Sequence, residues 1–290
     1  MSKKLSVHLD TDIGDDIDDA FCLALLLRSP EIDLRSVSTV LNDTPGRADM
    51  CRELCDAAGQ SPKIIAGSRS VITRRQHTHG MTRKPPHTAS KSFDYKTDGG
   101  ALLGTLVDVR QSYDVLLTIG PKTNLALSLV ADPDITRFPR YLAMACEITV
   151  CNHAEWNILI DPEAADVVCR TGMPIDFISW KVGIDTKLSL EEQAWLDRQT
   201  NPVAKVLNNY RAQFRKTHAT TQNMYDPMTV VALLHEEWFT WRRGYLRVEV
   251  AGEHSMGLTF LRDDPAGPHR VAVGVDAEKA KKWMLERLGD

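Results

Sequence analysis

Strand-like and helix-like segments alternate from the start of this chain. Residues 4–11 (KLSVHLDT) carry apolar side chains at alternate positions, as expected of a short strand, and residues 18–28 (DDAFCLALLLR) form an apolar run typical of a buried helix. The same patterns predict further strands at 34–41, 62–67, 115–120 and 175–183 and further helices at 47–59, 121–132, 193–214 and 224–234. We therefore predict an α/β fold, a single domain whose mainly parallel sheet is flanked by helices in an open Rossmann-type arrangement.

Length and composition narrow the class of protein. The chain has 290 residues, of which 43% are hydrophobic and 26% charged, and its formal net charge is −4. This composition excludes wholesale disorder, and the mild acidity argues against a nucleic-acid partner. No apolar run approaches the ~20 residues of a membrane-spanning helix, and six cysteines in a chain of this length do not indicate a disulfide framework. We expect one domain over residues 1–290, in the cytoplasm, with no membrane partner.

Residues 73–100 interrupt the alternation with a long polar segment rich in Arg, His, Lys, Pro and Thr. Long segments of this kind are commonly lids over a functional site, and the alternative is a solvated surface loop. Open α/β sheets bind their ligands at the carboxyl ends of the strands. We predict that this segment is a lid loop.

Six aspartates lie within ten residues at the end of the first predicted strand, in HLDTDIGDDIDDA (residues 8–20). Carboxylates at this density repel one another unless a cation or solvent compensates their charge. A solvated acidic loop is the simpler interpretation, but this cluster lies between an apolar strand and an apolar helix, at the edge where ligands bind. Hard oxygen ligands without neighbouring His or Cys favour Ca²⁺ or Mg²⁺ over zinc. The sequence therefore predicts a cation site.

The aspartate motif DTDIGDDIDDA (residues 10–20) resembles the N-terminal signature DxDxGxDDA of the inosine-uridine-preferring nucleoside hydrolase family. Further segments resemble that family in the same order along the chain. They are Asn42, His79-Gly80, TIGPKTNLA (118–126; family TGPLTNLA), HAEWNILIDPEAADVV (153–168; family AEFNIxxDPEAAxxV), VGIDTK (182–187; family VGLDxT) and YDP (225–227; family HDP). The resemblance therefore covers essentially the whole chain.

This resemblance implies Ca²⁺-dependent hydrolysis of the N-glycosidic bond of ribonucleosides to free base and ribose, in purine or pyrimidine salvage, by a homodimer or homotetramer. The implied calcium ligands are Asp12, Asp19, Asp226 and the carbonyl of Ile119. Asp12 is also the implied general base that activates the attacking water, with Tyr225 and His79 near the leaving base. The implied sugar contacts are Asp18, Asn42, Asn152, Glu155, Trp156 and Asn157. Negative charge around the sugar suits the oxocarbenium-like transition state of this reaction.

The sequence departs from the family pattern at three places. The first motif has two additional residues before its last aspartate pair, so Asp15 and Asp16 compete with Asp18 and Asp19 as cation ligands; we favour the latter pair. The glycines expected before AEFN are missing, which leaves the choice of Asn152 open. Tyr225 replaces the His of HDP, and a tyrosine with a pKa near 10 is a poor proton donor at neutral pH.

Other interpretations stay open at this point. With Tyr225 in that position, a different base, a different sugar, or protonation by His79 or Tyr210 is compatible with the sequence. The main alternative function is a non-catalytic or altered-substrate nucleoside- or sugar-binding protein on the same scaffold. A phosphatase of the haloacid-dehalogenase type, with Asp10 as nucleophile, is a further alternative that lacks the downstream residues it needs. The alternative roles of single residues are a helix start for Glu155, a core position for Trp156 and a helix N-cap for Asp226.

Overall fold

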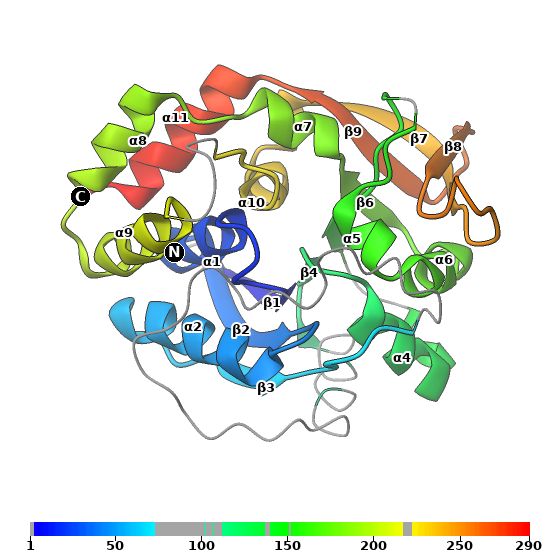
Figure 1. The fold of residues 1–290 in the computed structure, drawn as a ribbon, viewed down its shortest axis with the longest axis horizontal. Coiled ribbons are helices and arrows are strands. Elements are labelled where there is room, and N and C mark those ends of the chain that lie inside the picture. The colour runs from blue at the N-terminus through cyan, green and yellow to red at the C-terminus, as the bar shows by residue number, and fades with distance from the viewer. Residues whose placement is uncertain are drawn as a thin grey trace.

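The computed structural model describes residues 3–72, 102, 106, 112–136, 140–150, 152–216 and 222–290. The predicted lid loop at 73–100, and His79 with it, lies outside the described residues. The described strands form one nine-stranded sheet in the order β3-β2-β1-β4-β5-β6-β9-β7-β8 (Figure 1). In chain order they are β1 (Leu5–Thr11), β2 (Ile32–Thr39), β3 (Lys63–Ala66), β4 (Val115–Thr118), β5 (Tyr141–Met144), β6 (Ile175–Ile178), β7 (Phe239–Val248), β8 (Thr259–Asp263) and β9 (His269–Val275).

Helices cover both faces of this sheet (Figure 1). The α-helices of the described residues are α1 (Asp18–Arg28), α2 (Thr44–Ala57), α4 (Thr123–Ala131), α5 (Trp156–Ile160), α6 (Pro162–Arg170), α7 (Trp180–Asp185), α8 (Leu190–Asp197), α9 (Pro202–Phe214), α10 (Pro227–Leu234) and α11 (Ala277–Leu288). Two short 3₁₀ turns, η1 (Pro133–Thr136) and η2 (Glu236–Trp238), accompany them.

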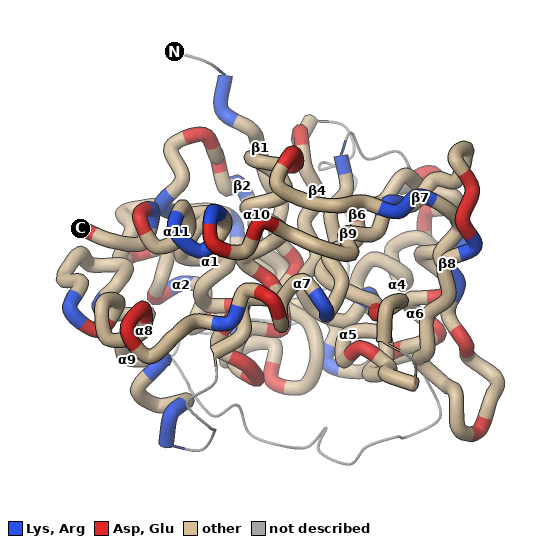
Figure 2. Tube along the Cα trace, turned by 90° about the horizontal axis from the view of Figure 1, so that it is seen from above, with Lys and Arg blue, Asp and Glu red and all other residues tan. Residues whose placement is uncertain are grey.

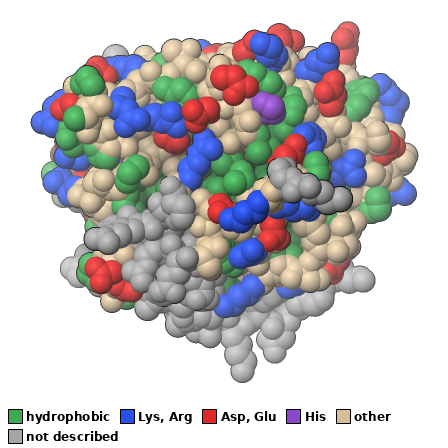
Figure 3. All heavy atoms as spheres, turned by 180° about the vertical axis from the view of Figure 1, so that it is seen from behind, with side chains coloured by type: hydrophobic (Ala, Val, Ile, Leu, Met, Phe, Trp, Pro, Cys, Tyr) green, Lys and Arg blue, Asp and Glu red, His purple; other side chains and the backbone are tan. Residues whose placement is uncertain are grey.

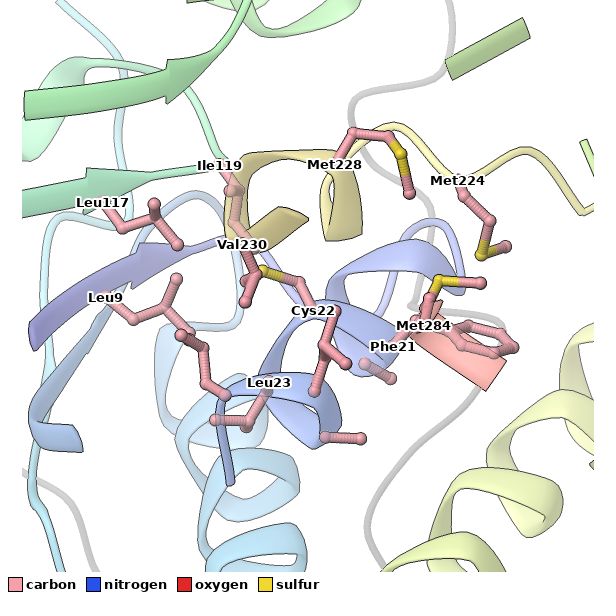
Figure 4. Packing of buried hydrophobic residues seen from close by; sticks show 14 of the residues in the cluster. Leu9, Phe21, Cys22, Leu23, Leu117, Ile119, Met224, Met228, Val230 and Met284 are labelled. Carbon is pink, nitrogen blue, oxygen red and sulfur yellow. The ribbon is translucent and has the colours of Figure 1, made fainter. Parts of the chain in front are cut away.

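The sheet separates two apolar cores. Adjacent residues of a strand point to opposite faces, so Leu117 lies in the core formed with α1, α2, α9, α10 and α11, and Leu116 lies in the core formed with α4 and α6. Figure 4 shows the first core, where Phe21 of α1 and Val230 of α10 are among the buried side chains. The packing of α1 against α10 brings segments about 200 residues apart in the sequence together.

The predicted α/β fold with a mainly parallel sheet is confirmed. Neighbouring strands in the run β3-β2-β1-β4-β5-β6-β9 pair in parallel, and β7 runs antiparallel to both β9 and β8. The β7–β8 extension was not predicted from the sequence. It adds two strands beyond the parallel part of the sheet and lies away from β1.

Two predicted elements were wrong in their bounds. The strand predicted at 175–183 ends at Ile178, and α7 begins at Trp180 after the extended Ser179. The helix predicted at 193–214 is two helices, α8 and α9. The break comes at Pro202, which has no N–H to continue a helix, and the side chain of Asn201 caps α9 by accepting a hydrogen bond from Ala204 N at 2.9 Å.

The surface mixes charges of both signs. Basic and acidic residues are distributed over the whole trace in Figure 2, and the described atoms of the face in Figure 3 show basic, acidic and apolar side chains interspersed. Within the described part of the chain, every helix is too short or too polar to cross a membrane.

Candidate active site

The carboxyl ends of β1 and β4 meet at the centre of the sheet. Asp10 pairs with Thr118 across these strands, and Ile119 N donates to the Asp10 carbonyl at 2.8 Å. Gly120 follows, and a Cβ atom at this position would lie 2.9 Å from Oδ1 of Asp12 and 2.8 Å from Cγ1 of Val40. The turn after β4 therefore needs glycine, because it passes directly beside the Asp12 carboxylate.

Three buried carboxylates gather at this edge. Asp18 and Asp19 open α1, Asp226 precedes α10, and one oxygen from each lies within 4.8 Å of the others. The Asp226 N–H also donates to Oδ2 of Asp18 at 3.2 Å, across 208 positions of sequence. The Asp226 side chain makes no capping hydrogen bond to α10, so its interpretation as a simple N-cap is wrong. Asp12 is buried close to these three, because its charge raises the pKa of each of them. We call Asp12, Asp18, Asp19 and Asp226 the carboxylate cluster.

Burial and mutual repulsion make ionisation of this cluster unfavourable. Burial raises the pKa of Asp18, Asp19 and Asp226 well above the usual range, and neighbouring carboxylates raise these pKa values further. Burial raises the pKa of Asp12 to about 7, against the charges of Arg47 and Lys122. Among the described residues, no Lys, Arg or His forms an ion pair with a member of the cluster. A bound cation would supply the missing charge.

The two competing aspartate pairs of the first motif lie in different surroundings. Asp15 forms an ion pair of 2.9 Å with Arg47, and Asp16 is exposed and accepts a hydrogen bond from Ile17 N at 2.6 Å. Asp18 and Asp19 are buried in the cluster. The additional residues thus form a turn outside the cluster, and the DDA pair keeps its position at the start of α1.

Arg47 fastens this turn to the loop after β2. Its guanidinium is fully buried and donates to the carbonyls of Asp12, Ile13 (2.8 Å) and Leu41 (2.8 Å) as well as to Asp15. Nothing in the sequence around Arg47 signalled this role, because a helical arginine usually lies in solvent.

The carbonyl of Ile119, the predicted backbone ligand of calcium, is hydrogen-bonded by Asn157, a predicted sugar contact. Asn157 Nδ2 donates to the Ile119 carbonyl at 2.7 Å and to the Met144 carbonyl at 3.3 Å. Glu155 caps α5, with its carboxylate accepting from Asn157 N at 2.9 Å and Ile158 N at 3.2 Å. The helix-start role of Glu155 is therefore present in the structure. The Glu155 carboxylate also accepts a hydrogen bond from Cys146 N at 3.3 Å, which fixes α5 to the end of β5.

The other predicted sugar contacts differ in exposure. Trp156 is 45% exposed, so the alternative of a core position is wrong. Asn42 is half-buried at the end of β2 with a left-handed φ of 56°, and its carbonyl accepts from Arg69. Asn152 is exposed in a turn with a φ of 61° and is not joined to the cluster by the hydrogen bonds described above.

Tyr225 precedes Asp226 and packs against α7. A Cβ atom on Gly183 would lie 1.9 Å from the Tyr225 ring, so the close contact requires glycine. The Tyr225 hydroxyl accepts from Asn223 Nδ2 at 2.8 Å, and burial raises the pKa of Tyr225 above its usual value. Tyr210 is fully buried and donates to Glu53 at 2.6 Å, which excludes it as a donor to a leaving base.

Asp10, the nucleophile of the phosphatase interpretation, is held by side chains of β2 and α4. Its side chain is buried, and Oδ1 accepts from Ser38 Oγ and from Asn124 Nδ2 (2.7 Å). These contacts join the Asp10 side chain to β2 and α4 and not to the carboxylate cluster, so they give no support to the phosphatase interpretation. A buried carboxylate cluster at the carboxyl edge of a parallel sheet suits a hydrolase that uses a divalent cation.

Comparison with known proteins gives the family. The family model "Inosine-uridine preferring nucleoside hydrolase" matches residues 7–282. Pyrimidine-specific ribonucleoside hydrolase RihA of Citrobacter koseri is 28% identical, over 98% of both chains, and RihA of an Enterobacter species is 29% identical, over 89% of this chain and 88% of its own. The chain therefore belongs to the inosine-uridine preferring nucleoside hydrolase family, and it is a glycosidase that acts on the N-glycosidic bond of nucleosides.

Solved structures share the fold. A plant nucleoside hydrolase superposes with a TM-score of 0.79 at 23% identity, covering 98% of both chains. The purine-preferring ribonucleoside hydrolase of Gardnerella vaginalis superposes with a TM-score of 0.77 at 22% identity, also over 98% of both chains.

Proposed function

We propose that this protein is a Ca²⁺-dependent ribonucleoside hydrolase in which Asp12 accepts the proton of the attacking water. The buried carboxylate cluster carries this proposal, because four buried acids can ionise together only when a cation compensates them. The proposed ligands are Asp12, Asp19, Asp226 and the Ile119 carbonyl, all hard oxygen donors of the kind that Ca²⁺ prefers. A bound divalent cation would lower the pKa of a water molecule and so favour a nucleophile at neutral pH.

The remaining chemistry belongs to the protein's own side chains. Without a cation, burial raises the pKa of Asp12 to about 7. A bound cation would lower this pKa and keep the Asp12 carboxylate ionised, which is the form that accepts a proton from the water. Asp18 would accept hydrogen bonds from the ribose hydroxyls, and the negative charge of the cluster would stabilise the positive sugar in the transition state. Asn157 donates to the Ile119 carbonyl, and its amide oxygen would accept from a ribose hydroxyl.

Which nucleobase the enzyme prefers in its substrate has to be measured with a panel of purine and pyrimidine ribonucleosides. Two relatives are named pyrimidine-specific, and one of the solved structures is named purine-preferring. Asn42, Asn152, Glu155 and Trp156 as sugar contacts, Tyr225 and His79 at the leaving base, a cytoplasmic location and a homodimer or homotetramer stay predictions.

The test is release of reducing sugar from purine and pyrimidine ribonucleosides, with calcium present. Wild-type protein should release ribose, and Asp12→Asn should lose roughly 10²–10⁴-fold in rate because it removes the general base. Asp16→Asn is the matched control, since Asp16 is an exposed aspartate of the same loop. Equal rates for the wild type and Asp12→Asn would contradict the proposed base.

A second candidate function is calcium-dependent nucleoside binding without turnover. Tyr225 favours it, because its raised pKa makes the hydroxyl a still poorer proton donor than an ordinary tyrosine. Nucleoside binding in equilibrium dialysis, together with no ribose from any member of the panel, would support this candidate over the hydrolase.

A further inference from the structure

Lys122 is a buried lysine at the turn after β4. The related family motif TGPLTNLA has leucine at this position, whereas this chain reads TIGPKTNLA. The Lys122 side chain is 2% exposed, and Nζ donates to the carbonyls of Gly120 (2.6 Å) and Met144 (3.2 Å). Among the described residues, no carboxylate lies within ion-pair distance of Nζ. The hydrogen bonds that stabilise its ammonium charge therefore go to neutral carbonyl oxygens.

These carbonyls lead directly to the carboxylate cluster. Gly120 lies against the Asp12 carboxylate and follows Ile119, the proposed backbone ligand. The Met144 carbonyl also accepts from Asn157, whose Nδ2 holds the Ile119 carbonyl. The ammonium of Lys122 is thus attached to the same short backbone segments as the proposed cation ligands.

Lys122 and the acidic side chains around it each shift the pKa of the other. Burial lowers the pKa of Lys122, and the charges of Glu155, Asp10, Asp12 and Asp226 act in the opposite direction. The Lys122 charge in turn lowers the pKa of Asp12 against the effect of burial. A fixed positive charge in a poorly hydrated interior acts strongly on its neighbours, because little water screens it.

We propose that Lys122 is an internal counter-charge of the carboxylate cluster, which stabilises the cluster without a cation and lowers its affinity for one. This inference rests on the proposed cation site. With no cation bound, the ammonium offsets part of the repulsion among the aspartates. When a divalent cation enters, the same ammonium repels it. Leucine in the related motif would do neither.

A purely structural role for Lys122 predicts a different result. If the ammonium only fixes the Gly120 turn, a neutral substitution destabilises the protein equally with and without cation, and cation affinity stays the same or falls. A counter-charge predicts the opposite sign, since removing it makes cation binding tighter. The direction of the affinity change therefore separates the two roles.

The experiment compares wild type with Lys122→Leu, Lys122→Met and Lys122→Arg. Each protein is stripped of metal with EDTA and titrated calorimetrically with Ca²⁺ and with Tb³⁺. The two neutral variants should bind Ca²⁺ roughly tenfold more tightly, and Lys122→Arg should stay near the wild type. Because Coulomb energy scales with ion charge, the change in log Kd should be about 1.5 times larger for Tb³⁺. Methionine keeps the unbranched stem and serves if the leucine variant does not fold.

Thermal unfolding gives a second readout. The neutral variants should have a lower Tm than the wild type without cation and should gain more Tm from saturating Ca²⁺. Unchanged or weaker binding in both neutral variants would overturn the counter-charge role while leaving the cation site intact. Failure of the wild type to bind either ion would overturn the cation site and this inference together.

Discussion

The two edges of the sheet both gather charged residues, but they treat charge in opposite ways. At the amino edge, where β6 and β9 begin, Arg270 donates to both oxygens of Asp176 at 2.7 and 2.6 Å and also to Glu236 at 3.2 Å. Arg140, just before β5, donates to Glu236 at 3.1 Å. At the carboxyl edge, the carboxylate cluster is buried and has no such partners among the described residues.

The difference separates stability from function. The amino-edge network is half-exposed and complete in itself, because each carboxylate there faces a guanidinium that stays charged. Buried acids without a cationic partner cost stability, and such groups are concentrated at functional sites. The carboxyl edge therefore carries an electrostatic cost that a cation would relieve, whereas the amino edge needs no ligand.

The largest expected contrast is in catalysis. Asp12→Asn should lower kcat by roughly 10²–10⁴-fold, because it removes the proposed general base, whereas Asp176→Asn should leave kcat almost unchanged. Ribose release by both variants measures this difference. A comparable loss of kcat in the two variants would mean that the edges are not functionally distinct.

The next contrast concerns pH without metal. The pKa of Asp12 is about 7 in the folded protein, above its ordinary value of 3.8, so folding favours the protonated form. The contribution of Asp12 to stability is fully present below pH 3.8 and is lost as pH rises through about 7. At pH 8, Asp12→Asn should therefore be more stable than the wild type, by on the order of 4 kcal/mol.

Urea unfolding of the two proteins in EDTA, from pH 4 to pH 8, tests this difference. The gap should close towards pH 4, where both side chains are uncharged. A gap that does not change with pH would show that Asp12 has an ordinary pKa in the folded protein.

The stabilisation of the protein by calcium should depend on the carboxyl edge and not on the amino edge. At a free concentration of 100 times Kd, Ca²⁺ should raise the free energy of unfolding of the wild type by about 2.7 kcal/mol. Asp226→Asn should lose most of this gain, and Asp176→Asn should keep it. Denaturant titrations with and without Ca²⁺ give the values, and retention of the full gain by Asp226→Asn would remove Asp226 from the proposed ligands.

The smallest effect is expected at the amino edge. Asp176→Asn leaves the Arg270 guanidinium with one neutral acceptor in place of a carboxylate, and this should cost about 1 kcal/mol of unfolding free energy. The loss should shrink in high salt, which screens the half-exposed pair. A loss as large as that from calcium removal would contradict the view of this network as a modest surface contribution.

Much of the fold could be predicted from local patterns. The alternating apolar residues of β1 and the apolar run of α1 specify a strand followed by a buried helix, and repetition of that pattern predicts a parallel sheet. Boundaries were less certain, since Ile178 and Trp180 lie in one apolar run that has no signal for the change from strand to helix. The antiparallel β7 belongs to a region rich in Arg and Trp, where the pattern favoured no element.

The site could be predicted only in part. The resemblance linked Asp19 to Asp226, and the structure brings both together through the contact of α1 with α10. Arg47 and Lys122 could not be predicted as buried, because their burial depends on carbonyls supplied by distant turns. The leucine-to-lysine difference in TIGPKTNLA is visible in the sequence, but it was not among the departures singled out there, and only the structure shows that Lys122 is buried.

The distance in sequence between Asp18 and Asp226 has a consequence for synthesis of the chain on the ribosome. The first aspartates emerge early, but their partner in the cluster is made 208 positions later. Until Asp226 has been made, the nascent protein lacks one of the proposed calcium ligands, even when calcium is abundant. Binding of the ion would therefore come late in synthesis, after α1 and α10 have packed against each other.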